Sequence, residues 1–252
     1  MFQRLCFRFF RRIDLVAAAL CVVLGSASVA AQQGAVDGEW HAYGADNGAT
    51  KYSPLDQINA DNVDDLRIAW TRRTVDQSIL DVVPDLGYGN GNLATPLMVD
   101  GILYAPNAVG LVEAFNPGTG ETVWVQQPYD NAPRSYRGAG TRGVAYWADG
   151  DEERIIVQRG EWMYALHPKT GELFRDFGDY GRVDLTTGLS EGARYRWGSA
   201  PTVVRDVIVL GQSMSDTFVT KEDIRGDVRA FDVRTGEPVS YTHLTLPTSD
   251  LV

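Results

Sequence analysis

The chain has 252 residues, of which 44% are hydrophobic and 22% charged, an ordinary composition for a globular protein that buries a core. Its formal net charge of -10 argues against a nucleic-acid partner, because nucleic-acid binding needs clustered Lys and Arg. The two cysteines, Cys6 and Cys21, both lie in the first 31 residues, so the remaining residues offer no thiolate metal site and no catalytic Cys. The histidines are too widely spaced in sequence to favour a zinc site or a Ser-His-Asp triad: His41, His167 and His243.

Residues 1–31 have the three-part layout of a secretory signal peptide. Four arginines precede an apolar run over residues 15–24, and small residues follow at 28–31. A membrane anchor is the alternative, but the run is short for the roughly 30 Å of hydrocarbon that a helix must cross. We therefore expect an exported, periplasmic protein whose leader is removed.

After the leader, the pattern predicts one helix and then strands. Asn59–Trp70 is the best helix candidate, with Asp61 or Asn62 as its cap. Strands are expected on both sides of the Asp100-Gly101 turn signal, and further β-branched runs follow. The expected strands are Thr95–Val99, Ile102–Ala105, Arg154–Gln158 and Pro201–Leu210.

A repeat occurs in three copies, and each copy contains Thr-Gly-Glu. The copies are Glu113–Trp124, Tyr164–Phe174 and Arg229–Val239. Each reads as a strand, a tight turn containing a residue free to take positive φ, and a second strand. The repeat glycines lie at 120, 171 and 236, which gives spacings of 51 and 65 residues. Spacings of this size indicate propeller blades, whereas ordinary hairpin chemistry is the plainer interpretation of a single copy.

Five segments in order resemble the family of PQQ-dependent (quinoprotein) dehydrogenases, where PQQ is pyrroloquinoline quinone. They are Trp40–Asp46, Lys51–Asn59, Thr95–Tyr104, Arg142–Trp147 and Phe177–Leu185. The last of these is similar to the membrane glucose dehydrogenase branch. The resemblance implies an all-β fold, an eight-bladed β-propeller of which residues 32–239 supply only the first blades. The resemblance to that branch also implies that the protein associates with the inner membrane.

The same resemblance implies a cofactor site. Arg142 matches the family arginine that contacts the quinone, and PQQ, a tricarboxylate, suits a guanidinium partner. Ser199 and Ser213 are implied as further cofactor-binding residues, and Asp216 as a ligand of Ca²⁺ or Mg²⁺. A surface arginine and a capping aspartate are the plainer interpretations of Arg142 and Asp216.

Two of the positions at which the chain departs from the family pattern bear on this site. Gly198 stands where the family has a threonine, and Leu93 stands where it often has an acidic residue. Leu93 puts one polar cofactor contact in doubt, and it is compatible with a different substrate.

The function implied is oxidation of a sugar, polyol or alcohol, with glucose as the first guess and ubiquinone or a cytochrome as electron acceptor. A quinoprotein ethanol dehydrogenase differs from this only in its substrate. A non-catalytic scaffold of the outer-membrane assembly type is the alternative, but it would need neither the Arg142–Trp147 segment nor Asp216. The catalytic base is expected outside these residues and stays unassigned.

The last 13 residues, 240–252, do not continue the family pattern. Ser240 occupies the place that Trp124 holds in the first repeat, and the sequence after it resembles translated sequencing-adapter DNA. We therefore expect this tail to be non-native and the gene to continue. The chain alone, with open sheet edges, is then expected to be unstable and inactive.

Overall fold

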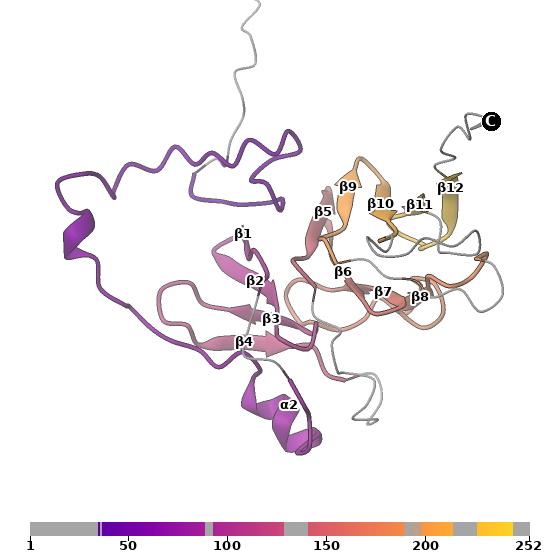
Figure 1. The fold of residues 1–252 in the computed structure, drawn as a ribbon, viewed down its shortest axis with the longest axis horizontal. Coiled ribbons are helices and arrows are strands. Elements are labelled where there is room, and N and C mark those ends of the chain that lie inside the picture. The colour runs from indigo at the N-terminus through magenta and orange to yellow at the C-terminus, as the bar shows by residue number, and fades with distance from the viewer. Residues whose placement is uncertain are drawn as a thin grey trace, which may run out of the picture. The chain divides into compact units, whose positions relative to one another are not determined.

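The computed structural model describes residues 35, 37–88, 93–128, 141–189, 195, 198–213 and 226–243. Within them the strands form three four-stranded antiparallel sheets, each built from one stretch of chain (Figure 1). Successive four-stranded sheets of this kind are the blades of a propeller, so the all-β propeller prediction is confirmed. No helix in the described part of the chain has the length and hydrophobicity needed to cross a membrane.

The first blade takes its strands in sequence order, from the innermost to the outermost. Its strands are β1 (Leu97–Val99), β2 (Ile102–Pro106), β3 (Val112–Phe115) and β4 (Thr122–Val125). Asp100 and Gly101 join β1 to β2 with φ angles of 49° and 75°. Positive φ at both central residues matches the twist of a two-residue hairpin, which explains the Asp-Gly pair.

The second and third blades repeat this order. The second contains β5 (Ala145–Asp149), β6 (Glu152–Arg159), β7 (Trp162–Leu166) and β8 (Arg182–Asp184). The third contains β9 (Thr202–Val204), β10 (Val207–Gly211), β11 (Asp227–Asp232) and β12 (Pro238–His243). The last strand thus includes Ser240, where the tail predicted to be foreign begins.

Each repeat contains the same turn. Gly120, Gly171 and Gly236 have φ angles of 72°, 72° and 74°. Each donates its N–H to the carbonyl four residues earlier, over 2.8–2.9 Å. A side chain with a Cβ is strained at such angles, so the glycine of Thr-Gly-Glu is explained by backbone conformation.

A side chain from an earlier segment of the chain also packs against each of these glycines. A Cβ on Gly120 would lie 2.6 Å from Cδ2 of Trp70, and one on Gly171 would lie 2.4 Å from Cε3 of Trp124. The Trp70 and Trp124 indoles donate hydrogen bonds to carbonyls of the same two turns, at 2.8 and 2.6 Å. At Gly236 the equivalent neighbour is Val183, whose Cγ2 would lie 2.5 Å from the Cβ.

Two apolar layers hold the blades together. One layer, between the first and second blades, includes Leu97, Val112, Ile155 and Val157, all at 0% exposure. The other joins the second blade to the third and is drawn from β5–β8 and β9–β11. Each fully buried aliphatic side chain contributes about 1.5–3 kcal/mol, so these layers dominate the cohesion of the described blades.

The prediction of a helix at Asn59–Trp70 was wrong. The expected helix Asn59–Trp70 contains only a 3₁₀ turn at Val63–Asp65, and the Asn62 side chain makes no capping bond to it. The α-helix α2 lies further on, at Gln77–Val82, and is capped by Asp76, whose carboxylate accepts the Ser78 N–H at 2.9 Å.

The run Pro201–Leu210, expected as one strand, is the hairpin of β9 and β10. The chain reverses at Arg205, where φ is 54°. The polar pair Arg205-Asp206 between two β-branched runs is the turn signal that sequence reasoning passed over.

Candidate functional site at the starts of the innermost strands

The innermost strands β1, β5 and β9 place two predicted cofactor residues at equivalent positions. Strand pairing makes Leu97, Ala145 and Thr202 equivalent, since their partners Tyr104, Ile156 and Val209 all pair with the repeat alanines on the next strand. Three residues before them stand Ala94, Arg142 and Ser199. Arg142 and Ser199 therefore occupy the same place in the second and third blades.

The starts of these three strands touch one another. The Thr95 N–H donates to the Arg142 carbonyl at 2.8 Å, which joins the first blade to the second. The Thr141 hydroxyl donates to the Ser199 carbonyl at 3.5 Å, which joins the second to the third. The site is thus one continuous junction.

Gly143 lies at the centre of this junction. A Cβ there would lie 3.1 Å from the Ala200 Cβ, 3.3 Å from the Tyr43 ring and 3.4 Å from the Thr95 carbonyl oxygen. These distances are tighter than ordinary van der Waals contact, so the close approach of three segments depends on a residue without a side chain.

Within the junction, the predicted side chains are available to a ligand. Arg142 is exposed and Ser199 half-buried. Ser213 is also exposed and follows β10, whose Gly211 end lies at the same end of the third blade as Ala200. Asp216 lies outside the described residues, so its predicted metal role stays a prediction.

Tyr195 supports the Ser213 side of the site. Its hydroxyl donates to the Gly211 carbonyl at 2.6 Å, and the ring is 2% exposed. Burial raises the pKa of Tyr195 well above its ordinary value, so the phenol stays neutral and keeps donating. Gly211, the last residue of β10 before Ser213, is thereby held in place.

This arrangement can bind an anion. A guanidinium stays charged at any relevant pH and presents a planar fork of donors to a carboxylate. Serine hydroxyls add donors that rotate to suit the ligand. The exposed Arg142, together with Ser199 and Ser213 at the same end of the blades, therefore fits a carboxylate-bearing cofactor such as PQQ. No cluster of three metal-binding side chains occurs in the described segments.

Sequence reasoning assigned no role to Tyr43, Gly143 or Thr141. The first two lie inside family motifs, but neither carries a charge that would mark it as a ligand-binding residue, as Arg142 does. Contacts between Gly143 and residues about 50 or 100 positions away leave no local signal in the sequence.

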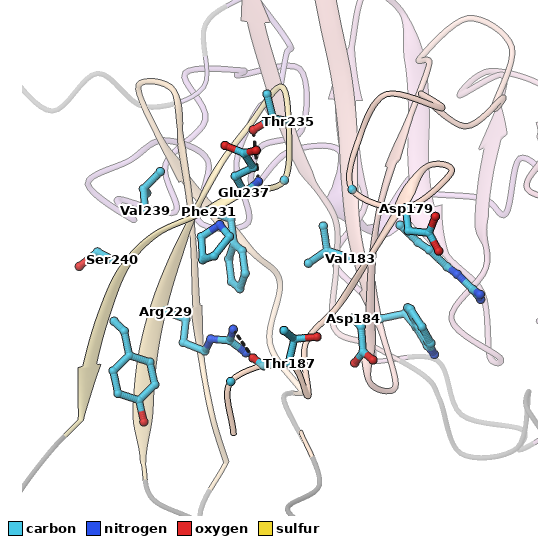
Figure 2. Close-up of a pocket in the computed structure, with 17 residues that line it drawn as sticks. Asp179, Val183, Asp184, Thr187, Arg229, Phe231, Thr235, Glu237, Val239 and Ser240 are labelled. Atoms are coloured by element: carbon cyan, nitrogen blue, oxygen red, sulfur yellow. Dashed lines mark hydrogen bonds between the residues drawn. The ribbon is translucent and has the colours of Figure 1, made fainter. Parts of the chain in front are cut away.

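A hollow of about 780 Å³ lies elsewhere, between β8 and the outer strands of the third blade (Figure 2). Its lining includes Val183, Phe231 and Arg229. The Arg229 guanidinium donates to the carbonyls of Leu185 and Thr187, at 2.5 and 2.9 Å. The hollow occurs where Val183 takes the place that Trp70 and Trp124 hold against the other repeat glycines. The Arg229 guanidinium in its lining is already bonded to two carbonyls. We therefore place the functional site at the strand starts instead.

The sequence is similar to known protein families and to individual proteins. The family model described as "PQQ: Glucose/ethanol/alcohol dehydrogenase, beta-propeller domain" matches residues 40–241. The quinoprotein glucose dehydrogenase of Escherichia coli K12 is 30% identical over 215 residues, covering 80% of this chain and 26% of the relative. Subunit 1 of the methanol dehydrogenase [cytochrome c] of Methylorubrum extorquens AM1 is 32% identical over 230 residues, covering 86% and 32%.

A solved structure agrees with these relatives. The quinohemoprotein alcohol dehydrogenase of Comamonas testosteroni superposes with a TM-score of 0.59 at 26% identity, covering 81% of this chain and 27% of that one. The chain thus spans about a quarter to a third of the length of the proteins that it matches. With a family model matching most of its length, the chain belongs to the quinoprotein glucose, ethanol and alcohol dehydrogenase family.

Proposed function

We propose that the protein is a PQQ-dependent dehydrogenase that oxidises a hydroxyl group of a sugar, polyol or alcohol. The observation that carries the proposal is the junction of the innermost strands, where the exposed Arg142 stands at the position that Ser199 holds in the next blade. A cation and a hydroxyl donor on adjoining blades suit a flat polyanion that spans both.

Each residue has a distinct task in this proposal. Arg142 binds an anionic oxygen of the cofactor, and Ser199 and Ser213 orient it through their hydroxyls. When bound, PQQ supplies the oxidising power by accepting two electrons and the carbinol hydrogen. Asp216 is proposed to ligate Ca²⁺ or Mg²⁺, hard cations that prefer oxygen donors.

The substrate, acceptor and compartment are proposed from the sequence and from the similar proteins. Glucose is the first candidate, because Phe177–Leu185 resembles the glucose branch and a quinoprotein glucose dehydrogenase is among the similar proteins. Alcohol and methanol dehydrogenases match equally well, so short alcohols belong in the same test. We propose ubiquinone or a cytochrome as acceptor, and the signal-peptide pattern supports a periplasmic location.

The test uses the full-length protein that contains this chain, purified without cofactor. Dye reduction is measured with glucose, polyols and short alcohols, with PQQ and Ca²⁺ added singly and together. Turnover that requires both additions supports the proposal and names the substrate class. Removing Ca²⁺ with a chelator should then abolish it.

Two variants make the test specific. Arg142→Ala should weaken PQQ uptake about 10- to 100-fold, the usual cost of a hydrogen bond to a charged group. Arg205→Ala is the matched control, since Arg205 is an exposed arginine in the β9–β10 turn at the opposite end of the third blade. If the wild type takes up no PQQ by absorbance, the non-catalytic scaffold becomes the better account.

A further inference from the structure

We propose that Tyr43 and Gly143 act together as a positioning element that holds Arg142 in its binding geometry. The inference deepens the proposed function and rests on it for the identity of the ligand. Neither residue contributes charge, and both act through the backbone that carries Arg142.

Tyr43 is held in place by a short N-terminal segment that pairs with the first blade. Trp40 and Met98 of β1 exchange backbone hydrogen bonds at 2.8 and 3.1 Å. The chain then reverses tightly, with Ala45 N–H donating to the Ala42 carbonyl at 3.0 Å. Tyr43 lies within this reversal, so its ring position is tied to the innermost strand of the first blade.

The Tyr43 ring packs on Gly143 although 43% of the tyrosine is exposed. Gly143 is not among the glycines with positive φ, so the backbone conformation does not require glycine there. The limited space does require glycine, because a Cβ would lie 3.1–3.4 Å from Tyr43, Ala200 and the Thr95 carbonyl. Gly143 therefore serves as the point where the N-terminal segment and the first and third blades converge.

The backbone on both sides of Arg142 is fixed by this junction. Its own carbonyl accepts the Thr95 N–H at 2.8 Å, and the side-chain hydroxyl of the preceding Thr141, which is 5% exposed, donates to the Ser199 carbonyl at 3.5 Å. The side chain of Arg142, in contrast, is exposed. Because these contacts hold the chain next to Arg142 and leave its side chain exposed, a few tenths of an ångström of displacement at Gly143 moves the guanidinium relative to Ser199.

The first experiment titrates full-length protein with PQQ and measures the dissociation constant. Gly143→Ala should raise it about tenfold, since small misplacements of binding groups are costly. Gly118→Ala is the matched control: its φ is also not positive, and its nearest contact is the Asn116 side chain at 3.4 Å, in the turn of the first repeat. Tyr43→Ala should weaken binding several-fold, whereas Tyr43→Phe, which keeps the ring, should bind as the wild type does.

A double-variant cycle separates positioning from general damage. In an Arg142→Ala background, Gly143→Ala should produce no further loss of PQQ affinity, because the residue it positions is gone. In a Tyr43→Ala background, the extra methyl has more room and should cost less than in the wild type. Losses that simply multiply in both backgrounds would overturn the inference.

A second readout needs no cofactor. Hydrogen exchange of the Thr95 amide, which donates to the Arg142 carbonyl, should be about tenfold faster in Gly143→Ala than in Gly118→Ala. Equal exchange in the two variants refutes the positioning element even if the protein binds no PQQ. If the wild type binds no PQQ but Thr95 still exchanges faster in Gly143→Ala than in Gly118→Ala, the proposed function is refuted and the positioning element is supported.

Discussion

Replacing Gly171 with Ala tests how the repeat glycine locks one blade to the next. Gly171 has φ of 72°, and a left-handed conformation costs a residue with a Cβ about 1–2 kcal/mol. The new Cβ would also lie 2.4 Å from Cε3 of Trp124, so the buried indole must move. Overpacking of this kind costs about 1–3 kcal/mol, which brings the expected total to about 2–5 kcal/mol.

Gly160→Ala isolates the packing part of that cost. Gly160 has φ of 60°, but a Cβ there would meet nothing within 4 Å. It should therefore lose only the conformational contribution of about 1–2 kcal/mol. The difference between the two variants, about 1–3 kcal/mol, measures the contact between Gly171 and Trp124.

Native-state hydrogen exchange in the full-length protein reports this difference locally. The amides of His167 and Phe174, which donate to Glu172 and Ala165, should exchange about 5- to 150-fold faster in Gly171→Ala than in Gly160→Ala. In a Trp124→Ala background that excess should disappear. Equal exchange in the two glycine variants, or an excess that survives loss of Trp124, would refute the locking argument.

Two further predictions concern charged groups. Glu113 is 4% exposed and accepts hydrogen bonds from Arg72 at 2.9 Å and from Asn107 at 3.0 Å. Glu113→Ala should therefore lower the free energy of unfolding, measured by chemical denaturation, by about 3–5 kcal/mol. A loss below about 1 kcal/mol would contradict this. A hydrogen bond from Arg154 holds the pKa of Glu152 below its ordinary 4.5, so its stabilisation is present above that value and is lost as the pH falls through the lowered folded-state pKa. Glu152→Gln should therefore flatten the acid side of the stability profile, and an unchanged profile would show that the pair adds nothing.

Local chemistry explains why much of the fold was readable from sequence. The Asp100-Gly101 and Thr-Gly-Glu turns depend on residues that tolerate positive φ, and the structure has them at those angles. A preference of this kind acts within a few residues, so it leaves a signal in the sequence whatever surrounds it. The extents of the signal peptide and of the foreign tail remain predictions from sequence alone.

The failed helix shows where such signals end. Leu66 and Ile68 are 54% and 83% exposed, so the apolar residues of Asn59–Trp70 do not form one buried helical face. Instead the segment extends to bring Trp70 onto Gly120, a contact across 50 residues. The spacing of apolar residues cannot distinguish a helix from an extended segment that packs against residues far away in the sequence.

The candidate site divides in the same way. Arg142 and Ser199 were accessible from sequence because family motifs contain them. Their equivalence, by contrast, depends on the register of β5 and β9, which pair with different strands. Tyr43 and Gly143 meet across 100 residues only because three segments converge where one residue has no side chain. Steric fit between distant segments is a property of the packed structure, and no local preference encodes it.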